Sequence, residues 1–260
     1  MNVVFWIGVK SSNELTNEKH NGFDYFEYSK NTWKYWCKKN NVEFYEYDST
    51  DWELIAHKVT WTRWFDLKSK LSHLDWNKIA VVDASYMIRW DSPNFFDMTF
   101  DGLSVFKSLE NVRWVAGGID GYKDLFPNVE FDLKRYIDCG FQIFTKSHLE
   151  FLSELKEFYL DNYKKICILE SSVSRGTDQP VYNYMLQKLG VDFRFELPNS
   201  FNLNHMNRFN WFSHNWQLKE DQTPYFIKYG NLWKFSGFDR KQRGPLMQQT
   251  WDIVKGMYNE

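Results

Sequence analysis

The first side chain with clear chemical potential is a carboxylate that closes an apolar segment. Residues 78–84 read KIAVVDA, and these β-branched and apolar residues predict a buried strand that ends at Asp83. A carboxylate at that position can bind a metal ion, a ribose hydroxyl or a cationic partner. It can equally well cap a turn, which is the structural alternative for a single aspartate at the end of a strand.

A second candidate pair, Asp178 and Gln179, directly precedes a predicted helix at 180–189 that Gly190 ends. A helix N-terminus presents N–H donors and a positive dipole, so an anionic or hydroxylated ligand could bind there. The alternative is plain N-capping of the helix by Thr177 or Asp178. Gly8 closes the first apolar run, where the backbone could approach a base or ribose closely, or simply turn.

The sequence predicts strands that alternate with helices around these residues. Strands are predicted at 3–9, 42–47, 78–84, 113–116, 141–144 and 192–196. Helices are predicted from a Ser29 cap onward, at 147–163 with a Ser147–Glu150 capping box, at 180–189 and at 244–258. This alternation predicts an α/β fold with helices flanking a mainly parallel sheet. Ligands in such folds bind beyond the carboxyl ends of the strands, where Asp83 lies.

Composition excludes several classes of protein. The chain is 43% hydrophobic and 25% charged, which is typical of a globular protein and not of a disordered one. The net charge of −2 gives no basic excess for nucleic acid. The three cysteines show no metal-binding spacing, no run of 18 apolar residues suggests a membrane span, and no signal peptide is apparent. We therefore expect a cytoplasmic protein, in the host cytoplasm if the Asn- and Lys-rich chain is viral.

Familiar nucleotide and hydrolase motifs are absent from the sequence. It contains no Gly-x-Gly-x-x-Gly, no Gly-x4-Gly-Lys-Ser/Thr and no Gly-x-Ser-x-Gly. These absences disfavour a dinucleotide dehydrogenase, a P-loop kinase and an α/β-hydrolase. The chain is instead rich in aromatic residues, and eleven of them fall within residues 201–238. They could form a wall for a sugar acceptor, or pack the core of a small C-terminal lobe.

Five short segments occur in an order that resembles the nucleotide-sugar glycosyltransferases of the GT-A fold, with the glycogenin-like and phage-encoded members closest. The strand and loop VVDASYMIRWDSPNFFD resemble the DxD region of that family. The other similar segments are 136–144, 177–184, 197–202 and 232–237, and the resemblance spans about residues 3–240. It implies a single GT-A (Rossmann-like) domain over 1–260, with a nucleotide-binding half at about 1–115 and a donor-sugar and acceptor half at 116–260.

The resemblance also implies an activity and a set of site residues. The enzyme would move a hexose-type sugar from a nucleotide diphosphate, with UDP favoured over GDP, to a glycan or another hydroxyl acceptor. Asp178 and Gln179 would contact the donor sugar near the reacting carbon. Substrate-binding positions would be Gly8, Arg63, Asp83, Ser85, Asp138, Gly140 and Gly237. For Arg63 in WTRW, a solvated helix charge is an equally good interpretation.

Two departures from the family pattern bear on metal binding. Ser85 stands where the second DxD carboxylate is expected, and Lys234 stands where a late histidine is expected. Divalent cations need several oxygen ligands, so Asp83 would offer at most a weak Mn²⁺ site, or no metal would be used. A lysine ammonium could then stabilise the leaving diphosphate as a catalytic group. If the alignment is displaced, Lys228 or His214 would take that position.

The residue at 138 raises a related question of charge. Asp138 replaces the asparagine that the resembled enzymes usually carry, and a carboxylate near a diphosphate is unfavourable unless a cation pairs with it. Lys234 and Arg175 are the candidate partners. The two missing metal ligands also keep a second function open. The chain could be a catalytically silent protein that binds a nucleotide sugar or a carbohydrate with the same fold.

Overall fold

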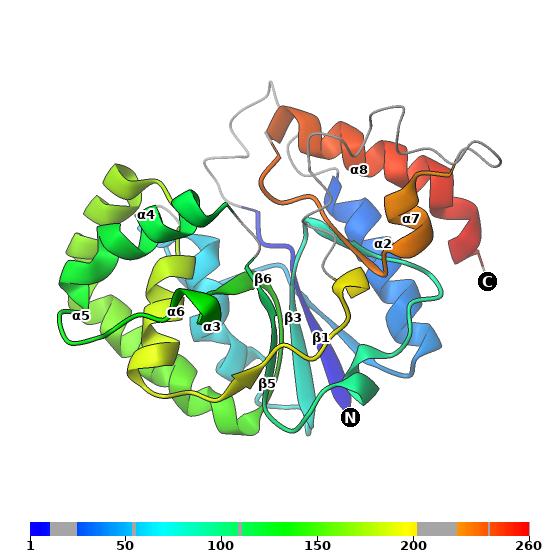
Figure 1. The fold of residues 1–260 in the computed structure, drawn as a ribbon. Coiled ribbons are helices and arrows are strands. Elements are labelled where there is room, and N and C mark those ends of the chain that lie inside the picture. Colours follow the sequence, from blue (N-terminus) through cyan, green and yellow to red (C-terminus); the bar gives the residue numbers. More distant parts are fainter. Residues whose placement is uncertain (11–24, 54–55, 109–110, 202–222, 239, 260) are drawn as a thin grey trace.

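Short apolar segments build the six-stranded sheet at the centre of the molecule (Figure 1). A computed structural model describes residues 1–10, 25–53, 56–108, 111–201, 223–238 and 240–259. The strand order is β2-β1-β3-β6-β5-β7. The strands are β1 (Asn2–Ile7), β2 (Glu43–Tyr47), β3 (Lys78–Asp83), β5 (Leu103–Lys107), β6 (Ile137–Thr145) and β7 (Phe193–Arg194).

One strand runs against the others. β6 pairs antiparallel with both β3 and β5, whereas β1 is parallel to β2 and β3, and β5 is parallel to β7. The sheet is therefore mixed but mainly parallel, as the sequence predicted. The amino end of β6 consequently lies at the same edge as the carboxyl ends of β1, β2 and β3. Residues at the start of β6 can thus meet residues that follow β3.

Alternating side chains bury both faces of this sheet. Val3 and Phe5 of β1 face one hydrophobic cluster, and Val4 and Trp6 face the other. The first cluster includes side chains of α3 (Val59–Lys70), α4 (Val112–Tyr122), α5 (Leu149–Val173) and α6 (Gln179–Lys188). The second includes those of α2 (Tyr25–Lys39). Figure 1 shows these two sets of helices on opposite sides of the sheet.

A small lobe packs beside α2. Its antiparallel strands are β4 (Tyr86–Ile88) and β8 (Leu232–Lys234), and its helices are α7 (Tyr225–Tyr229) and α8 (Arg240–Val254). The lobe has a core of its own that includes Trp233 and Met247. Short 3₁₀ turns complete the described elements, at Phe95–Met98, Lys123–Leu125, Leu133–Arg135, Lys146–His148, Asn199–Phe201 and Lys255–Tyr258.

Three local predictions are wrong. Residues 113–116 are helical in α4, because the Asn111 side chain accepts a hydrogen bond from the backbone N–H of Arg113 at 2.8 Å and starts the helix there. Ser29 is no cap: it is buried within α2 and donates to the backbone carbonyl of Tyr86. The Ser147 capping box is also absent, since α5 begins at Leu149 without a side-chain cap and continues to Val173.

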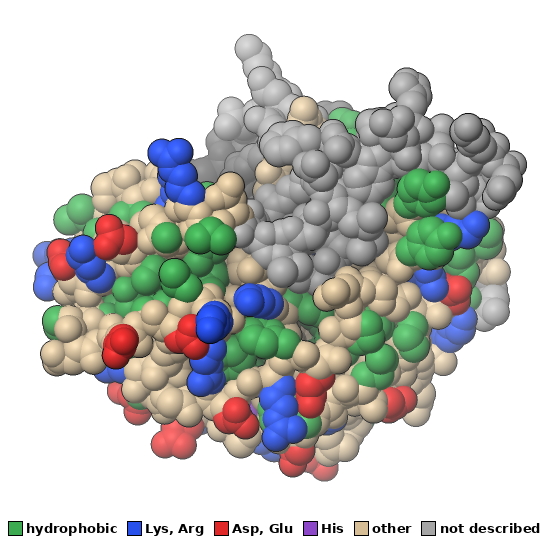
Figure 2. Space-filling view, in the orientation of Figure 1, with side chains coloured by type: hydrophobic (Ala, Val, Ile, Leu, Met, Phe, Trp, Pro, Cys, Tyr) green, Lys and Arg blue, Asp and Glu red, His purple; other side chains and the backbone are tan. Residues whose placement is uncertain are grey.

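The surface carries no single dominant charge in the view shown. Figure 2 shows Lys and Arg side chains interspersed with Asp and Glu over the described part of this face, in keeping with the net charge of −2. Within the described residues, none of the helices combines the length and the apolar character that crossing a bilayer requires.

Candidate functional site

Strand register places three of the predicted residues at one edge of the sheet. Ile7 of β1 lies opposite Asp83, so Gly8 follows directly beside that carboxylate. On the other side, Val82 lies opposite Phe141 of the antiparallel strand β6, which brings Gly140 next to Asp83. Gly8 and Gly140, 132 positions apart in the chain, therefore converge at the carboxyl end of β3, where the fold class predicts a ligand site.

Arg63 of α3 is the centre of this edge and is only 3% exposed. Its Nη2 atom donates to Asp178 Oδ2 at 2.8 Å, and its Nη1 atom lies 3.9 Å from Asp83 Oδ2. Burial acts to lower the pKa of Arg63, but the Asp178 and Asp83 carboxylates outweigh it and the pKa is raised. Arg63 is thus a buried permanent cation that ties α3 to β3 and α6, and not a solvated helix charge.

Asp178 occupies the N-cap position of α6, yet its side chain makes no capping hydrogen bond. Its Oδ2 atom accepts one from Arg63 and another from the indole Nε1 of Trp64 at 2.7 Å. The Arg63 guanidinium also lies 4.6 Å from the centre of the Trp64 ring. Neither hydrogen bond uses Asp178 Oδ1. Capping therefore does not account for Asp178, whose carboxylate is held in a fixed orientation by α3.

Asn183 of α6 fixes the start of β6. Its side-chain oxygen accepts from the backbone N–H of Ile137 at 2.7 Å, and its side-chain nitrogen donates to the Ile137 carbonyl at 3.1 Å. The same nitrogen donates to the carbonyl of Gln179, whose side chain is half-buried at the first residue of the helix. This clamp holds Asp178 and Gln179 in register with Asp138, the residue that follows Ile137.

The ammonium of Lys234 forms an ion pair with Asp138, and both residues are more than nine-tenths buried. Pairing of β4 with β8 places Lys234 opposite Tyr86, whose hydroxyl lies 3.5 Å from Asp138 Oδ1. Asp138 Oδ1 also accepts from the backbone N–H of Gly140 at 2.7 Å. Lys234, and not Arg175, is therefore the partner that the sequence required for this carboxylate.

Asp83 is the most accessible of the three carboxylates, with 37% of its side chain exposed. Its Oδ1 atom accepts from the backbone N–H of Ser85 at 2.8 Å, a local turn that aims the carboxylate beyond the strand. The Ser85 hydroxyl is buried and has no hydrogen-bond partner in the described structure. Its backbone carbonyl accepts from the N–H of Phe235, which fixes β8 against this turn.

Close contacts and backbone conformation explain why glycine occupies three positions at this edge of the sheet. A Cβ atom at Gly140 would lie 2.5 Å from the Tyr86 hydroxyl, so only glycine permits the close approach of β4 to β6. Gly237 follows β8 with a φ of +88°, a left-handed conformation that favours glycine. A Cβ atom at Gly8 would meet the ring of Trp6. These contacts explain the residue types without assigning them a ligand.

The cluster offers little to a metal ion. The cluster contains three carboxylates and two cations, so its formal charge is −1. Its members are Asp83, Asp138, Asp178, Arg63 and Lys234. Asp178 and Asp138 accept hydrogen bonds from the two cations, and Asp83, 3.9 Å from Arg63, is the most exposed of the three carboxylates. In the parts of the chain that the structure describes, no three His, Cys, Asp or Glu side chains lie close enough to hold a metal ion.

Sequence reasoning missed two members of the cluster. Trp64 positions Asp178, and Tyr86 packs its ring 5.7 Å from the Lys234 ammonium. Both lie within segments already singled out, WTRW and DASY, but as aromatic residues they are indistinguishable from core packing. Of the alternatives for Lys234, Lys228 is exposed and lines a different pocket. His214 and residues 202–222 of the aromatic segment lie outside the described residues.

Comparison with solved structures identifies the fold. A glycosyltransferase involved in the glycosylation of the major capsid of PBCV-1 aligns over 96% of this chain and 100% of its own, with a TM-score of 0.58 and 12% identity. The chain has a GT-A-like glycosyltransferase fold. The bifunctional glycosyltransferase WbbM matches over 99% of this chain and 50% of its own, with a TM-score of 0.50 and 12% identity.

A third structure is less similar. The galactosyltransferase LgtC in complex with donor and acceptor sugar analogues aligns over 99% of this chain at 13% identity, and its TM-score of 0.48 does not by itself establish a common fold. No protein-family model and no curated protein matches the sequence. The fold therefore rests on the structural matches, and the activity must be argued from the site.

Proposed function

We propose that the protein is a glycosyltransferase that moves a hexose-type sugar from a nucleotide diphosphate, with UDP favoured over GDP, to a glycan or another hydroxyl acceptor. One observation carries the proposal. In a glycosyltransferase fold, Arg63 joins Asp83 and Asp178 at the carboxyl edge of the sheet, the place where this fold class binds ligands. The PBCV-1 capsid glycosyltransferase, with the same fold, supports the reaction class.

The cluster divides the substrate between two halves of the chain. The half-exposed carboxylate of Asp83 would face the nucleotide, with Gly8 and the turn at Ser85 beside it. Asp178 would contact the donor sugar through Oδ1, since its described hydrogen bonds end on Oδ2. Gln179 would join it from the first residue of α6, where the helix dipole favours an electronegative group. Asp138, Gly140 and Gly237 would line the region beyond.

Transfer breaks the bond between the anomeric carbon and the diphosphate oxygen, and the electron pair leaves with the diphosphate. A new bond forms between that carbon and the acceptor oxygen, which gives up its proton. The protein must therefore stabilise negative charge on the leaving group. A lysine ammonium has three N–H donors, of which Asp138 uses one. We assign Lys234 to the diphosphate oxygens through the remaining donors, in place of a divalent cation.

The charge of the cluster makes this assignment testable. With a formal charge of −1, the five residues would repel a diphosphate unless positive charge is directed at it. If Lys234 supplies that charge, sugar transfer should survive EDTA. Lys234→His combined with Ser85→Asp should then create a requirement for Mn²⁺, because it restores a second carboxylate and an imidazole. Loss of wild-type activity in EDTA and its recovery with Mn²⁺ would instead assign the charge to a cation on Asp83.

The test of the function itself is release of UDP from UDP-glucose, UDP-galactose and UDP-N-acetylglucosamine, with a parallel thermal-shift measurement. A ligand that binds the native state raises the melting temperature by mass action. The proposal expects both a thermal shift and UDP release with at least one donor. A thermal shift without UDP release, with or without added acceptor glycans, would favour the silent binding protein. No shift with any donor would refute both functions.

A further inference from the structure

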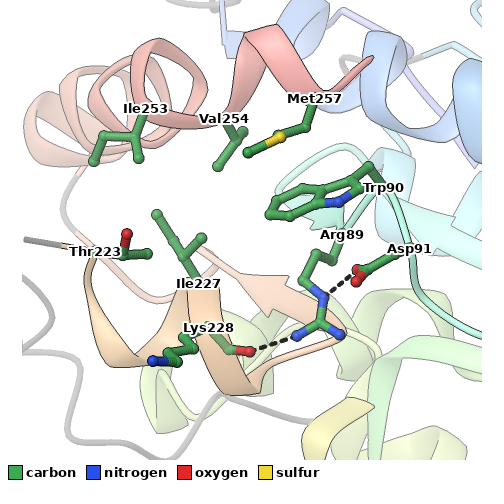
Figure 3. Close-up of a pocket in the computed structure, with 9 residues that line it drawn as sticks. All are labelled: Arg89, Trp90, Asp91, Thr223, Ile227, Lys228, Ile253, Val254 and Met257. Carbon is green, nitrogen blue, oxygen red and sulfur yellow. Dashed lines mark hydrogen bonds and ion pairs between the residues drawn. The ribbon is translucent and has the colours of Figure 1, made fainter. Parts of the chain in front are cut away.

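A second pocket lies at the far end of the β4–β8 strand pair (Figure 3). Its volume is about 280 Å³. Residues Arg89 to Asp91, which directly follow β4, form one side of it, and α7 and the end of α8 form the others. Trp90 lies four positions after Tyr86 of the candidate site, which corresponds to roughly 13 Å along an extended chain. The pocket is therefore separate from the candidate site but connected to it by β4.

The ring of Trp90 forms one wall of the pocket, and Tyr258, which does not line the pocket, holds this ring in place. Trp90 makes an edge contact with the ring of Tyr258, at 6.1 Å between ring centres. The Tyr258 hydroxyl donates to the carbonyl of Ile88, which anchors that ring to β4. Figure 3 shows the Trp90 indole beside the cavity, with Ile227 and Val254 across from it. Ile227 and Val254 are buried, so the apolar surfaces are parts of the lobe's core and are already in position.

The polar side of the pocket pairs a donor with an acceptor. Arg89 Nε donates to Asp91 Oδ1 at 2.5 Å, and Arg89 Nη1 donates to the carbonyl of Lys228 at 2.6 Å (Figure 3). These two bonds fix the guanidinium without using Nη2. The described contacts of Asp91 likewise do not use Oδ2, and 49% of this side chain is exposed. A rigid N–H donor thus lies beside a carboxylate acceptor at the rim of an apolar pocket.

We infer that this pocket binds one pyranose unit of a glycan. A pyranose has an apolar C–H face that stacks on the negative face of an indole, and a rim of hydroxyls that both donate and accept. Trp90 matches the first feature, and the Arg89–Asp91 pair matches the second. A purely aliphatic ligand would leave the Arg89–Asp91 ion pair unused. Ligand pockets in proteins start at about 300 Å³, so this one suits a single ring.

This inference rests on the proposed function, because it concerns the acceptor of the transfer reaction. The acceptor would be an oligosaccharide that binds both at the candidate site and at this pocket. The transferred sugar would react at the carboxyl edge of the sheet, while a more distant unit of the same glycan stacks on Trp90. Sugar binding at the pocket can nevertheless be measured without any transfer reaction. Failure of the pocket and failure of the enzyme activity are therefore distinguishable.

The test is saturation-transfer NMR with the methyl glycosides of glucose, galactose, mannose and N-acetylglucosamine as probes. We expect at least one glycoside to receive saturation at the C–H protons of one ring face. Trp90→Leu and Asp91→Asn should each weaken its binding by about tenfold, the effect of losing about 1.4 kcal/mol of binding energy. Phe195→Leu is the matched control, because Phe195 is an exposed aromatic residue outside this pocket and should change nothing.

Two results with the glycosides alone would overturn the inference. One is the absence of saturation transfer to every glycoside. The other is binding that persists in the folded Asp91→Asn and Trp90→Leu proteins, which would place the sugar elsewhere. If Trp90→Leu does not fold, Asp91→Asn decides alone, since its half-exposed side chain keeps its shape. Uridine serves as a competitor, and displacement of the glycoside by uridine would assign the pocket to a nucleobase. UDP release, measured separately, reports on the enzyme activity alone.

Discussion

Replacement of Lys234 by methionine removes the cation from the buried ion pair and leaves the side-chain length nearly unchanged. Asp138 would keep its hydrogen bond from the Gly140 backbone and its contact with the Tyr86 hydroxyl. Only 3% of its side chain is exposed, so water cannot replace the lost ammonium. The variant therefore removes the Lys234 counter-charge from a buried carboxylate.

The size of the effect follows from this burial. Two unit charges 4 Å apart interact by about 4 kcal/mol at an effective dielectric constant near 20. Measured losses for breaking one side of a buried ion pair are about 3–5 kcal/mol, whereas removal of both charges is often nearly neutral. We therefore expect Lys234→Met to lower the free energy of unfolding by about 3–5 kcal/mol near neutral pH. The double variant Lys234→Met/Asp138→Asn should recover most of that loss.

Urea unfolding measures both quantities. Lys255→Met is the matched control, because Lys255 pairs with Asp252 on the surface with more than half of each side chain exposed. It should leave the urea midpoint unchanged. Acid should reduce the penalty in Lys234→Met, since protonation neutralises the buried carboxylate. A loss below about 1 kcal/mol in Lys234→Met, or no recovery in the double variant, would show that the pair is not desolvated as described.

Three further predictions concern the cluster and its surroundings. Trp64→Phe keeps an aromatic ring beside Arg63 but removes the N–H donor to Asp178, a hydrogen bond worth about 1.5–3 kcal/mol for a charged acceptor. Steady-state kinetics should therefore show a fall in turnover of about tenfold to a hundredfold. An unchanged turnover would contradict the positioning role of Trp64. Burial raises the pKa of the Cys37 and Cys139 thiols. A disulfide reagent should therefore label only Cys167 in the native protein and all three cysteines after denaturation. Labelling of Cys139 in the native protein would contradict its burial. Burial also raises the pKa of Tyr136 and Tyr182 in the folded protein. As the pH rises, the unfolded chain loses these protons first and is thereby stabilised relative to the folded protein, so the urea midpoint should fall above about pH 10. A constant midpoint there would contradict these shifts.

The sheet and the helix at the site could be predicted because their sequence signals are local. The run KIAVVDA predicts β3 from residue type alone, and Pro180 and Gly190 mark the start and the end of α6. The short segment 113–116 was misassigned because an arginine followed by three apolar or aromatic residues fits a strand and a helix turn equally well. The Asn111 cap was the signal that could have decided it.

The contacts of the site could be predicted only in part. The sequence required a cation for Asp138 and offered two, but pairing of β4 with β8 selects Lys234. Arg63 was equally consistent with a surface charge, because its two carboxylate partners come from β3 and α6, distant in the chain. The role of Trp64 follows only from the orientation of α3 against α6. Such contacts arise from tertiary packing, which a single sequence does not contain.

The most direct test of the proposed activity compares Asp178→Asn with the wild type in UDP release and in UDP binding. Asp120→Asn is the matched control, because 75% of that side chain is exposed and its described ion pair is with Lys123 on the surface. If Asp178 contacts the reacting sugar, its variant should lose about a hundredfold in turnover, or about 2.7 kcal/mol, while the Kd for UDP stays nearly constant. Unchanged turnover in Asp178→Asn, or an equal loss of turnover and UDP binding, would show that Asp178 does not contact the reacting sugar.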